Sequence, residues 1–254
     1  MHEKIFGLVG YPLEHSLSPQ IFKNIFDTEN IKNAIYKLFP IKNINEILSI
    51  IKENENLQGL NITMPYKRSI IPFLNHIDEI VKNTGSVNTI KIKRHNGNTF
   101  IKGYNTDFAA ILDQINILFP NSNINKALIL GTGGAANTAK KALELFTKEN
   151  NILMASRNPV EKYHISYNEI TKALLDDLNL VINATPLGMF PNIHSMPNFP
   201  FHIANKNIVF IDLIYNPKET LFLKLAKKIG AKTVNGQLIL KTQALNSWKI
   251  WNSK

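Results

Sequence analysis

The sequence predicts an α/β fold with two domains, and three observations support this prediction. Short apolar runs alternate with helical patterns along most of the 254 residues. A hairpin signal at Asn96-Gly97 closes the first series of strands, which indicates a mixed sheet. A glycine-rich turn at 131–136 then opens a second, independent series of strands and helices.

Composition limits the classes of function. Hydrophobic residues make up 44% of the chain, which is enough for a core. We expect a cytoplasmic protein, because the sequence contains no run of 18 apolar residues and no signal-peptide pattern. The absence of Cys excludes disulfides and thiolate chemistry, and we expect no metal site.

The net charge of +10 is spread along the chain, and only three of the 29 basic residues are Arg. This distribution indicates a solvated surface and anionic small ligands rather than a nucleic-acid partner.

The first series begins with an apolar run that turns at Gly10 and leads into a helix near Pro19. Ser16 and Ser18 place hydroxyl groups at this helix start, where they can cap the helix or hold a carboxylate. The strands predicted in this series are Ile5–Val9, Ala34–Phe39, Gly59–Thr63, Val87–Lys93 and Thr99–Gly103. An amphipathic helix is predicted at Ile44–Ile51, and helical segments are predicted between Lys67 and Asn83.

Polar residues follow two of these strands. Thr63 and Lys67 leave the edge of the sheet around Pro65, which fixes the backbone there. Thr106 or Asp107 can cap the helix predicted at Phe108–Ile117. Asp107 also lies between the two series, where a cleft between two domains would form.

The turn at 131–136 follows the apolar run Ala127–Leu130 and fits the pattern G-x-G-x-x-G/A. Gly131 permits the tight turn, Gly133 lets the backbone approach a pyrophosphate, and Ala136 allows the helix to pack on the strand. Gly134 and Ala135 lie in the turn beside Gly133, just before a helix whose N-terminal N–H groups attract phosphates. The second series therefore predicts a Rossmann-like dinucleotide-binding domain, with an ordinary glycine turn as the alternative.

The strand predicted at Asn151–Ala155 is followed by Ser156, Arg157 and Asn158. Arg157 lies 26 positions after Gly131. An NAD site commonly has an acidic residue at this strand end, and none is present. A guanidinium with two neutral polar neighbours suits a 2′-phosphate, so NADP is the expected cofactor.

The remaining elements complete the second series. Further strands are predicted at Leu178–Ala184 and Ile208–Leu213, and helices at Asn137–Phe146, Glu219–Ile229 and Gln237–Trp251. Thr185 and Met189 lie in a loop after one of these strands, and Gly236 precedes the last helix.

Seven features occur in one order and cover the chain from about residue 5 to the last helix. They are HSLSP (15–19), NITMPYK (61–67), SVNT (86–89), GYNTD (103–107), GTGGAA (131–136), NATPLGM (183–189) and Gln243. This ordered set resembles the shikimate dehydrogenase family.

The resemblance implies an N-terminal mixed-sheet α/β domain that binds substrate and a Rossmann-like domain that binds NADP, separated by a cleft. We assign residues 1–105 and the helix 237–254 to the substrate domain, and residues 106–236 to the cofactor domain. The implied reaction is the reversible reduction of 3-dehydroshikimate to shikimate, by an oxidoreductase of chorismate and aromatic amino-acid biosynthesis.

Site residues follow from the same resemblance. Lys67 and Asp107 would form the catalytic pair, with Lys67 donating a proton and stabilising the alkoxide. Residues implied to bind substrate are Ser16 and Ser18 at the carboxylate, and Thr63, Asn88, Asp107, Gln243 and Lys67 at the ring hydroxyls. Tyr215 matches a position near the carboxylate or is a buried aromatic residue. Thr185, Met189 and Gly236 would border the nicotinamide.

Three alternatives stay open at this point. A quinate/shikimate dehydrogenase using NAD is opposed by Arg157, and a methylene-tetrahydrofolate dehydrogenase is opposed by HSLSP and GYNTD. A nucleotide-binding module without turnover is opposed by the presence of both Lys67 and Asp107. We expect a monomer or a homodimer.

Overall fold

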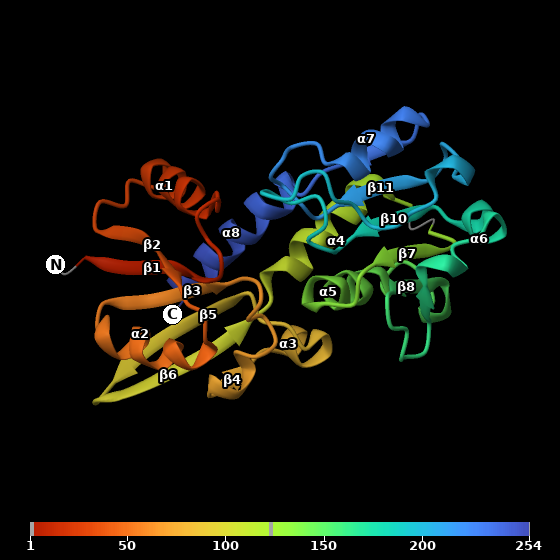
Figure 1. The fold of residues 1–254 in the computed structure, drawn as a ribbon. Coiled ribbons are helices and arrows are strands. Elements are labelled where there is room, and N and C mark those ends of the chain that lie inside the picture. Colours follow the sequence, from red (N-terminus) through yellow and green to blue (C-terminus); the bar gives the residue numbers. More distant parts are fainter. Residues whose placement is uncertain (1–2, 122–123, 254) are drawn as a thin grey trace. The chain divides into compact units, whose positions relative to one another are not determined.

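The computed structural model describes residues 3–121 and 124–253. The chain divides into two compact units (Figure 1). One unit ends at Thr106 and resumes at Lys241, and the other comprises Asp107–Leu240. In the described residues, each unit is built on one six-stranded sheet, and no helix there is long and apolar enough to cross a membrane.

The first unit has a mixed sheet, as predicted. Its elements are β1 (Lys4–Gly10), α1 (Ser18–Thr28), β2 (Ala34–Pro40), α2 (Ile47–Glu53), β3 (Leu57–Ile62), β4 (His76–Ile77), α3 (Glu79–Thr84), β5 (Thr89–His95), β6 (Asn98–Tyr104) and the C-terminal part of α8 (Gln237–Asn252). The strand order is β2-β1-β3-β5-β6-β4. Strand β1 is parallel to β2 and β3, whereas β5 is antiparallel to β3 and β6.

The hairpin between β5 and β6 is confirmed. His95 pairs with Asn98, and the two residues between them have positive φ values of 50° at Asn96 and 77° at Gly97. Two consecutive residues with positive φ are what a type I′ turn requires, which explains the Asn-Gly pair.

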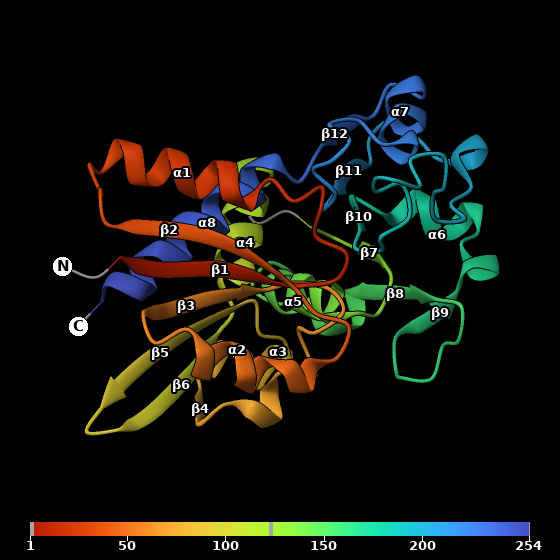
Figure 2. The same ribbon diagram turned by 60° about the vertical axis from the view of Figure 1, so that its left-hand side comes forward.

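The two faces of this sheet carry different cores. Helices α1 and α8 lie on one face of the sheet (Figure 2). A cluster of buried residues there includes Phe6, Phe22 and Trp251. Trp251 lies directly over Gly59 and donates from Nε1 to the carbonyl of Ile90 at 2.9 Å. Aliphatic residues of α2, α3 and the strands fill the other face. The C-terminal part of α8 is therefore part of the first unit's core.

The second unit has a doubly wound sheet. Its elements are α4 (Thr106–Leu118), β7 (Ala127–Leu130), α5 (Gly134–Leu143), β8 (Ile152–Ser156), β9 (His164–Ser166), α6 (Lys172–Asp177), β10 (Leu180–Asn183), β11 (Val209–Asp212), α7 (Leu221–Lys228), β12 (Lys232–Val234) and the start of α8. All neighbouring strands are parallel, in the order β12-β11-β10-β7-β8-β9. This is the Rossmann order, which confirms the predicted fold class.

Buried residues line both faces of this second sheet. One cluster joins α4, α5 and the beginning of α8 to the strands, and the other joins α6, α7 and the segment around Phe201. Strands β7, β10 and β11 are almost fully buried, as expected for a parallel sheet covered on both faces.

Several boundaries differ from the predictions. Strands β4, β9 and β12 have only two or three residues and were not predicted, and β4 falls in a segment predicted as helical. Helix α5 begins at Gly134 rather than Asn137, and α4 begins at Thr106 rather than Phe108. The N–H of Thr106 donates to the side chain of Asn88 at 2.7 Å, so the residue directly before β5 satisfies the start of α4.

Candidate active site

The segments that follow β1 and β3 start side by side. The N–H of Thr63 donates to Val9 at 2.9 Å, and the N–H of Tyr11 donates to Met64 at 3.1 Å. A Cβ atom added at Gly10 would lie 2.4 Å from Cγ2 of Thr63. Glycine is therefore required at the end of β1 for this close approach.

Ser16 and Ser18 lie where the segment after β1 enters α1. Ser16 is half-buried, Ser18 is buried, and Oγ of Ser16 accepts from the N–H of Ser18 at 3.2 Å. The cap position of α1 is Leu17, which makes no side-chain bond, so the prediction that Ser18 caps this helix is wrong. Ser16 instead satisfies the first N–H of the helix.

Backbone bonds also bring Lys67 and Asn88 to this end of the sheet. The N–H of Ile62 donates to the carbonyl of Asn88 at 2.8 Å, and the N–H of Val87 donates to that of Lys67 at 2.8 Å. Thr63 and Lys67 are half-buried, whereas Asn88 is buried. The sheet therefore gathers these three predicted site residues at the end of β3.

Asn88 connects this cluster to α4 and α8. Its Nδ2 donates to Oγ1 of Thr106 at 2.9 Å and to Oε1 of Gln243 at 3.4 Å. Its Oδ1 accepts from the N–H of Thr106, the residue directly before Asp107. The amide of Asn88 thus fixes both Gln243 and the backbone from which Asp107 follows.

A buried polar cluster lies next to Asn88 and was not assigned a role from the sequence. Asn61 donates from Nδ2 to Thr89 at 3.1 Å and to Ser247 at 2.9 Å, and its Oδ1 accepts from the hydroxyl of Tyr36 at 2.8 Å. Oγ of Ser247 also lies 3.2 Å from Oγ1 of Thr106. A polar residue in a buried strand needs hydrogen-bond partners. The polar residues Asn61 and Thr89 in the buried parts of their strands were therefore the sequence signal for this cluster.

In the second unit, the glycine turn follows β7 and lies against the loop after β10. Gly131 has a φ of 107°, and a Cβ atom there would lie 3.0 Å from Cγ2 of Thr185. Strands β7 and β10 are neighbours whose connections leave in opposite directions, which makes this the switch point of the sheet. Ligands of doubly wound sheets bind at the carboxyl ends of the strands at that point.

Gly133 and the start of α5 leave space for an anion. Gly133 is the N-cap of α5 and makes no side-chain cap bond, and a Cβ atom added to it would meet nothing within 4 Å. Gly134 and Ala135 form the first turn of the helix, and Ala136 is fully buried against the sheet. The N-terminal N–H groups and the helix dipole favour a phosphate at this position.

The end of β8 carries the three residues expected near a ribose. Oγ of Ser156 accepts from the N–H of Asn158 at 3.1 Å and donates to its carbonyl. Arg157 is exposed, and its charge opposes the rise in the pKa of Tyr167 that burial causes. The turn therefore presents a guanidinium at the edge of the switch-point region.

The loops after β10 and β11 hold the remaining predicted residues of this unit. Thr185 and Met189 are half-buried, as is Tyr215. A Cβ atom on Gly236 would lie 2.2 Å from the carbonyl oxygen of Leu213, and the Gly236 N–H donates to Ile214 at 3.0 Å. Close backbone packing is thus a sufficient reason for glycine at position 236.

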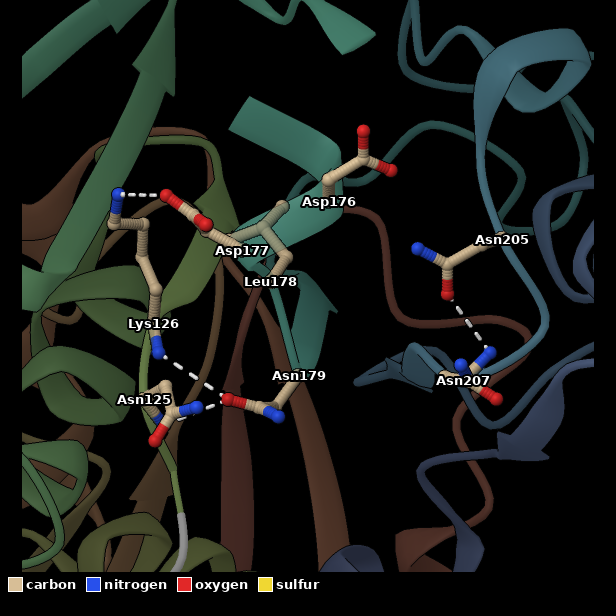
Figure 3. Close-up of a pocket in the computed structure, with 8 residues that line it drawn as sticks. All are labelled: Asn125, Lys126, Asp176, Asp177, Leu178, Asn179, Asn205 and Asn207. Carbon is tan, nitrogen blue, oxygen red and sulfur yellow. Dashed lines mark hydrogen bonds and ion pairs between the residues drawn. The ribbon is translucent and has the colours of Figure 1, made fainter. Parts of the chain in front are cut away.

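Figure 3 shows a pocket at the N-terminal ends of strands β7, β10 and β11. There, Oδ1 of Asn179 accepts from the N–H groups of Asn125 at 2.6 Å and Lys126 at 3.3 Å. Nζ of Lys126 lies 3.1 Å from the carboxylate of Asp177. These contacts join the segments that precede β7 and β10, at the strand ends opposite the glycine turn.

Comparisons with known proteins show similarity to one family. The family model described as the shikimate dehydrogenase substrate binding domain matches residues 8–90. A relative, shikimate dehydrogenase (NADP+) of Methanococcus maripaludis, is 37% identical over 99% of this chain and 92% of its own length.

Solved structures show the same similarity. Shikimate dehydrogenase 1 from Peptoclostridium difficile has a TM-score of 0.85 and 37% identity, over 98% of this chain and 91% of that chain. A shikimate dehydrogenase in complex with NADP+ has a TM-score of 0.83 and 31% identity, over 98% of this chain and 90% of that chain.

Proposed function

Since this chain belongs to the shikimate dehydrogenase family, we propose that it catalyses the reversible NADP-dependent reduction of 3-dehydroshikimate to shikimate. The observation that carries the proposal is the gathering of Thr63, Lys67 and Asn88 at the end of β3, with Gln243 bonded to Asn88. These are the side-chain types that a polyol with a reacting carbonyl requires.

We assign substrate binding to residues 1–105 with the C-terminal helix 237–254, and cofactor binding to residues 106–236. The match of residues 8–90 to a substrate binding domain supports the first assignment. The switch point with its glycine turn supports the second.

The residues of the second unit fit NADP. The open space beside Gly133 suits the pyrophosphate, and Arg157, Ser156 and Asn158 suit the 2′-phosphate. Gly131, Gly134 and Ala135 shape the phosphate turn, and Thr185, Met189 and Gly236 border the nicotinamide. When bound, the reduced nicotinamide supplies the hydride that the ring carbon accepts.

Lys67 acts as the proton donor in this proposal. The ammonium gives a proton to the carbonyl oxygen as the alkoxide develops, and it stabilises the negative charge on that oxygen. Asp107 holds the reacting hydroxyl and orients the proton transfer. The bond from Thr106 to Asn88 supports this role, because it fixes the backbone directly before Asp107.

The other polar residues recognise the substrate. Ser16 and Ser18 bind the carboxylate, and Tyr215 contributes near it. Thr63, Asn88 and Gln243 bind the ring hydroxyls. Buried amides and hydroxyls of this kind reject analogues that lack a hydroxyl, because the protein groups would then lose their partner.

A two-by-two assay tests the proposed function. Nicotinamide absorbance is followed with shikimate or quinate, each combined with NADP or NAD. We expect turnover with shikimate and NADP to exceed the other three combinations. Preference for quinate with NAD would favour a quinate dehydrogenase, and no turnover despite nucleotide binding would favour a binding module.

We also propose that the enzyme acts in the cytoplasm as a monomer or a homodimer. Light scattering coupled to size-exclusion chromatography distinguishes the two assemblies, since the mass of one chain is 28.8 kDa. A larger assembly would contradict this expectation.

A further inference from the structure

Asp212 is the last residue of β11, and it is fully buried. Its carboxylate accepts from Oγ1 of Thr220 at 2.6 Å, from the N–H of Ile214 at 3.0 Å and from Nδ2 of Asn183 at 3.1 Å. All three partners are donors, so they match an ionised carboxylate. A buried charge is costly, and an apolar residue would serve the core better.

The carboxylate determines the orientation of the Asn183 amide. Because a carboxylate can only accept, Nδ2 of Asn183 must face Asp212, and Oδ1 must face the other way. That oxygen accepts from the N–H of Thr185 at 3.0 Å and from its Oγ1 at 2.7 Å. Asn183 also donates to the carbonyl of Leu187 at 3.4 Å.

Thr185 is the first residue of the segment 185–189, which we call the cofactor loop, and its bonds to Asn183 hold the start of this loop in place. Its Oγ1 accepts from the N–H of Leu187 at 3.2 Å. Its methyl group lies beside Gly131, where an added Cβ atom would be 3.0 Å away. A hydrogen-bonded chain therefore runs from Asp212 through Asn183 and Thr185 to the contact with the glycine turn.

We propose that Asp212 is a positioning residue that fixes the cofactor loop against the glycine turn through Asn183, with Thr220 orienting the carboxylate. This proposal rests on the proposed binding of NADP by that loop. Asp212 itself needs no contact with the cofactor or the substrate. Its effect is on cofactor affinity, because the loop would otherwise have to be ordered when NADP binds.

The direct test is Asp212→Asn. Both carboxylate oxygens of Asp212 accept hydrogen bonds, whereas the side chain of Asn has one accepting oxygen. The NH2 group of Asn would therefore face one of the present donors and lose that hydrogen bond. We expect the Kd for NADPH, measured by nicotinamide fluorescence, to rise about tenfold, as one lost charge-assisted bond implies. The KM for shikimate should change less than twofold. A folded variant with wild-type NADPH affinity would overturn the proposal.

A second set of variants applies even if Asp212→Asn does not fold. Thr220→Val removes the donor to Asp212, and Thr220→Ser keeps it. Thr220 also caps α7, so Thr171→Val is the matched control, because Thr171 caps α6 in the same way. Of these three variants, only Thr220→Val should weaken NADPH binding. Thr220→Ser and Thr171→Val should bind NADPH as the wild-type protein does.

Equal NADPH affinity in Thr220→Val and Thr171→Val would contradict the positioning role, whatever their effect on unfolding. The outcome is separate from the proposed reaction. If the wild-type protein binds NADPH but does not oxidise shikimate, the proposed function fails, while the affinity comparison still decides the role of Asp212.

Discussion

Lys67 is the residue on which the proposed chemistry depends. A positioned proton donor contributes about 10²–10⁴-fold to turnover, whereas binding depends on many contacts. We expect Lys67→Ala to lower kcat by at least about 10²-fold and to change shikimate affinity much less. Turnover and equilibrium binding should be measured together, with the exposed Lys37→Ala as control. Near-normal kcat would exclude Lys67 as the proton donor.

Arg157 should determine the preference for NADP over NAD. Its guanidinium can form a charge-assisted fork to a 2′-phosphate, and NAD has no such group. We expect Arg157→Ala to raise KM for NADP about tenfold or more and to leave KM for NAD within about twofold. The exposed Arg68→Ala serves as control. Equal losses with both cofactors would indicate adenine stacking or misfolding instead.

Asp212 should give a measurable pH dependence of stability. Burial raises its pKa from 3.8 to about 6, against the opposing hydrogen bonds from Thr220, Ile214 and Asn183. Between these values the folded state binds the proton more tightly than the unfolded chain. The contribution of this group to the free energy of unfolding therefore falls as pH rises through the window.

The wild-type free energy of unfolding should thus decrease relative to that of Asp212→Asn by about 2 kcal/mol from pH 4 to pH 7. Urea denaturation at several pH values measures this difference. A difference that is constant with pH would show that Asp212 does not titrate in this window.

Single residues also show how far sequence reasoning reaches. The motif predicted a tight turn at Gly131, and this residue has a φ of 107°. Asn61 and Asp212 form buried polar networks, and no local pattern reveals partners that lie 186 positions away, as Ser247 does from Asn61. A buried polar residue in an apolar strand signals that a partner exists, but its identity depends on tertiary packing.

At the scale of elements, strands of four or more residues were predictable and strands of two or three residues were not. The strand Ala127–Leu130 was predicted with the observed bounds, and the Asn96-Gly97 hairpin was confirmed. Strands such as β4, with two residues, contain too few positions to show alternation. The start of α4 was misplaced because its first N–H is satisfied by Asn88, 18 positions earlier.

Two glycines in the second unit allow structural and ligand roles to be separated. Gly133→Ala adds a methyl group to open space, so the loss of stability should be at most about 1 kcal/mol. Affinity for NADPH should still fall, because the methyl group would occupy the pyrophosphate approach. Fluorescence titration and urea denaturation give the two quantities.

Gly236→Ala provides the contrast. Its Cβ atom would collide with the backbone at Leu213, so we expect a loss of about 2 kcal/mol or more in the free energy of unfolding. If Gly133→Ala proves the less stable variant, or binds NADPH normally, the assignment of the glycine turn is wrong.

At the scale of the whole molecule, the order of motifs carried more information than any motif alone. Family membership follows from identity over nearly the full chain, and the two sheets have the predicted classes.

A crystal structure of Lys67→Met with NADP+ and shikimate would test the central claim most directly, since this change removes the proton donor and keeps the fold of the site. We predict the 2′-phosphate on Arg157 and the pyrophosphate at Gly133 and the start of α5. We predict shikimate in contact with Ser16, Ser18, Thr63, Asn88, Asp107 and Gln243. Shikimate bound away from the end of β3, or NADP+ bound away from the glycine turn, would contradict the account.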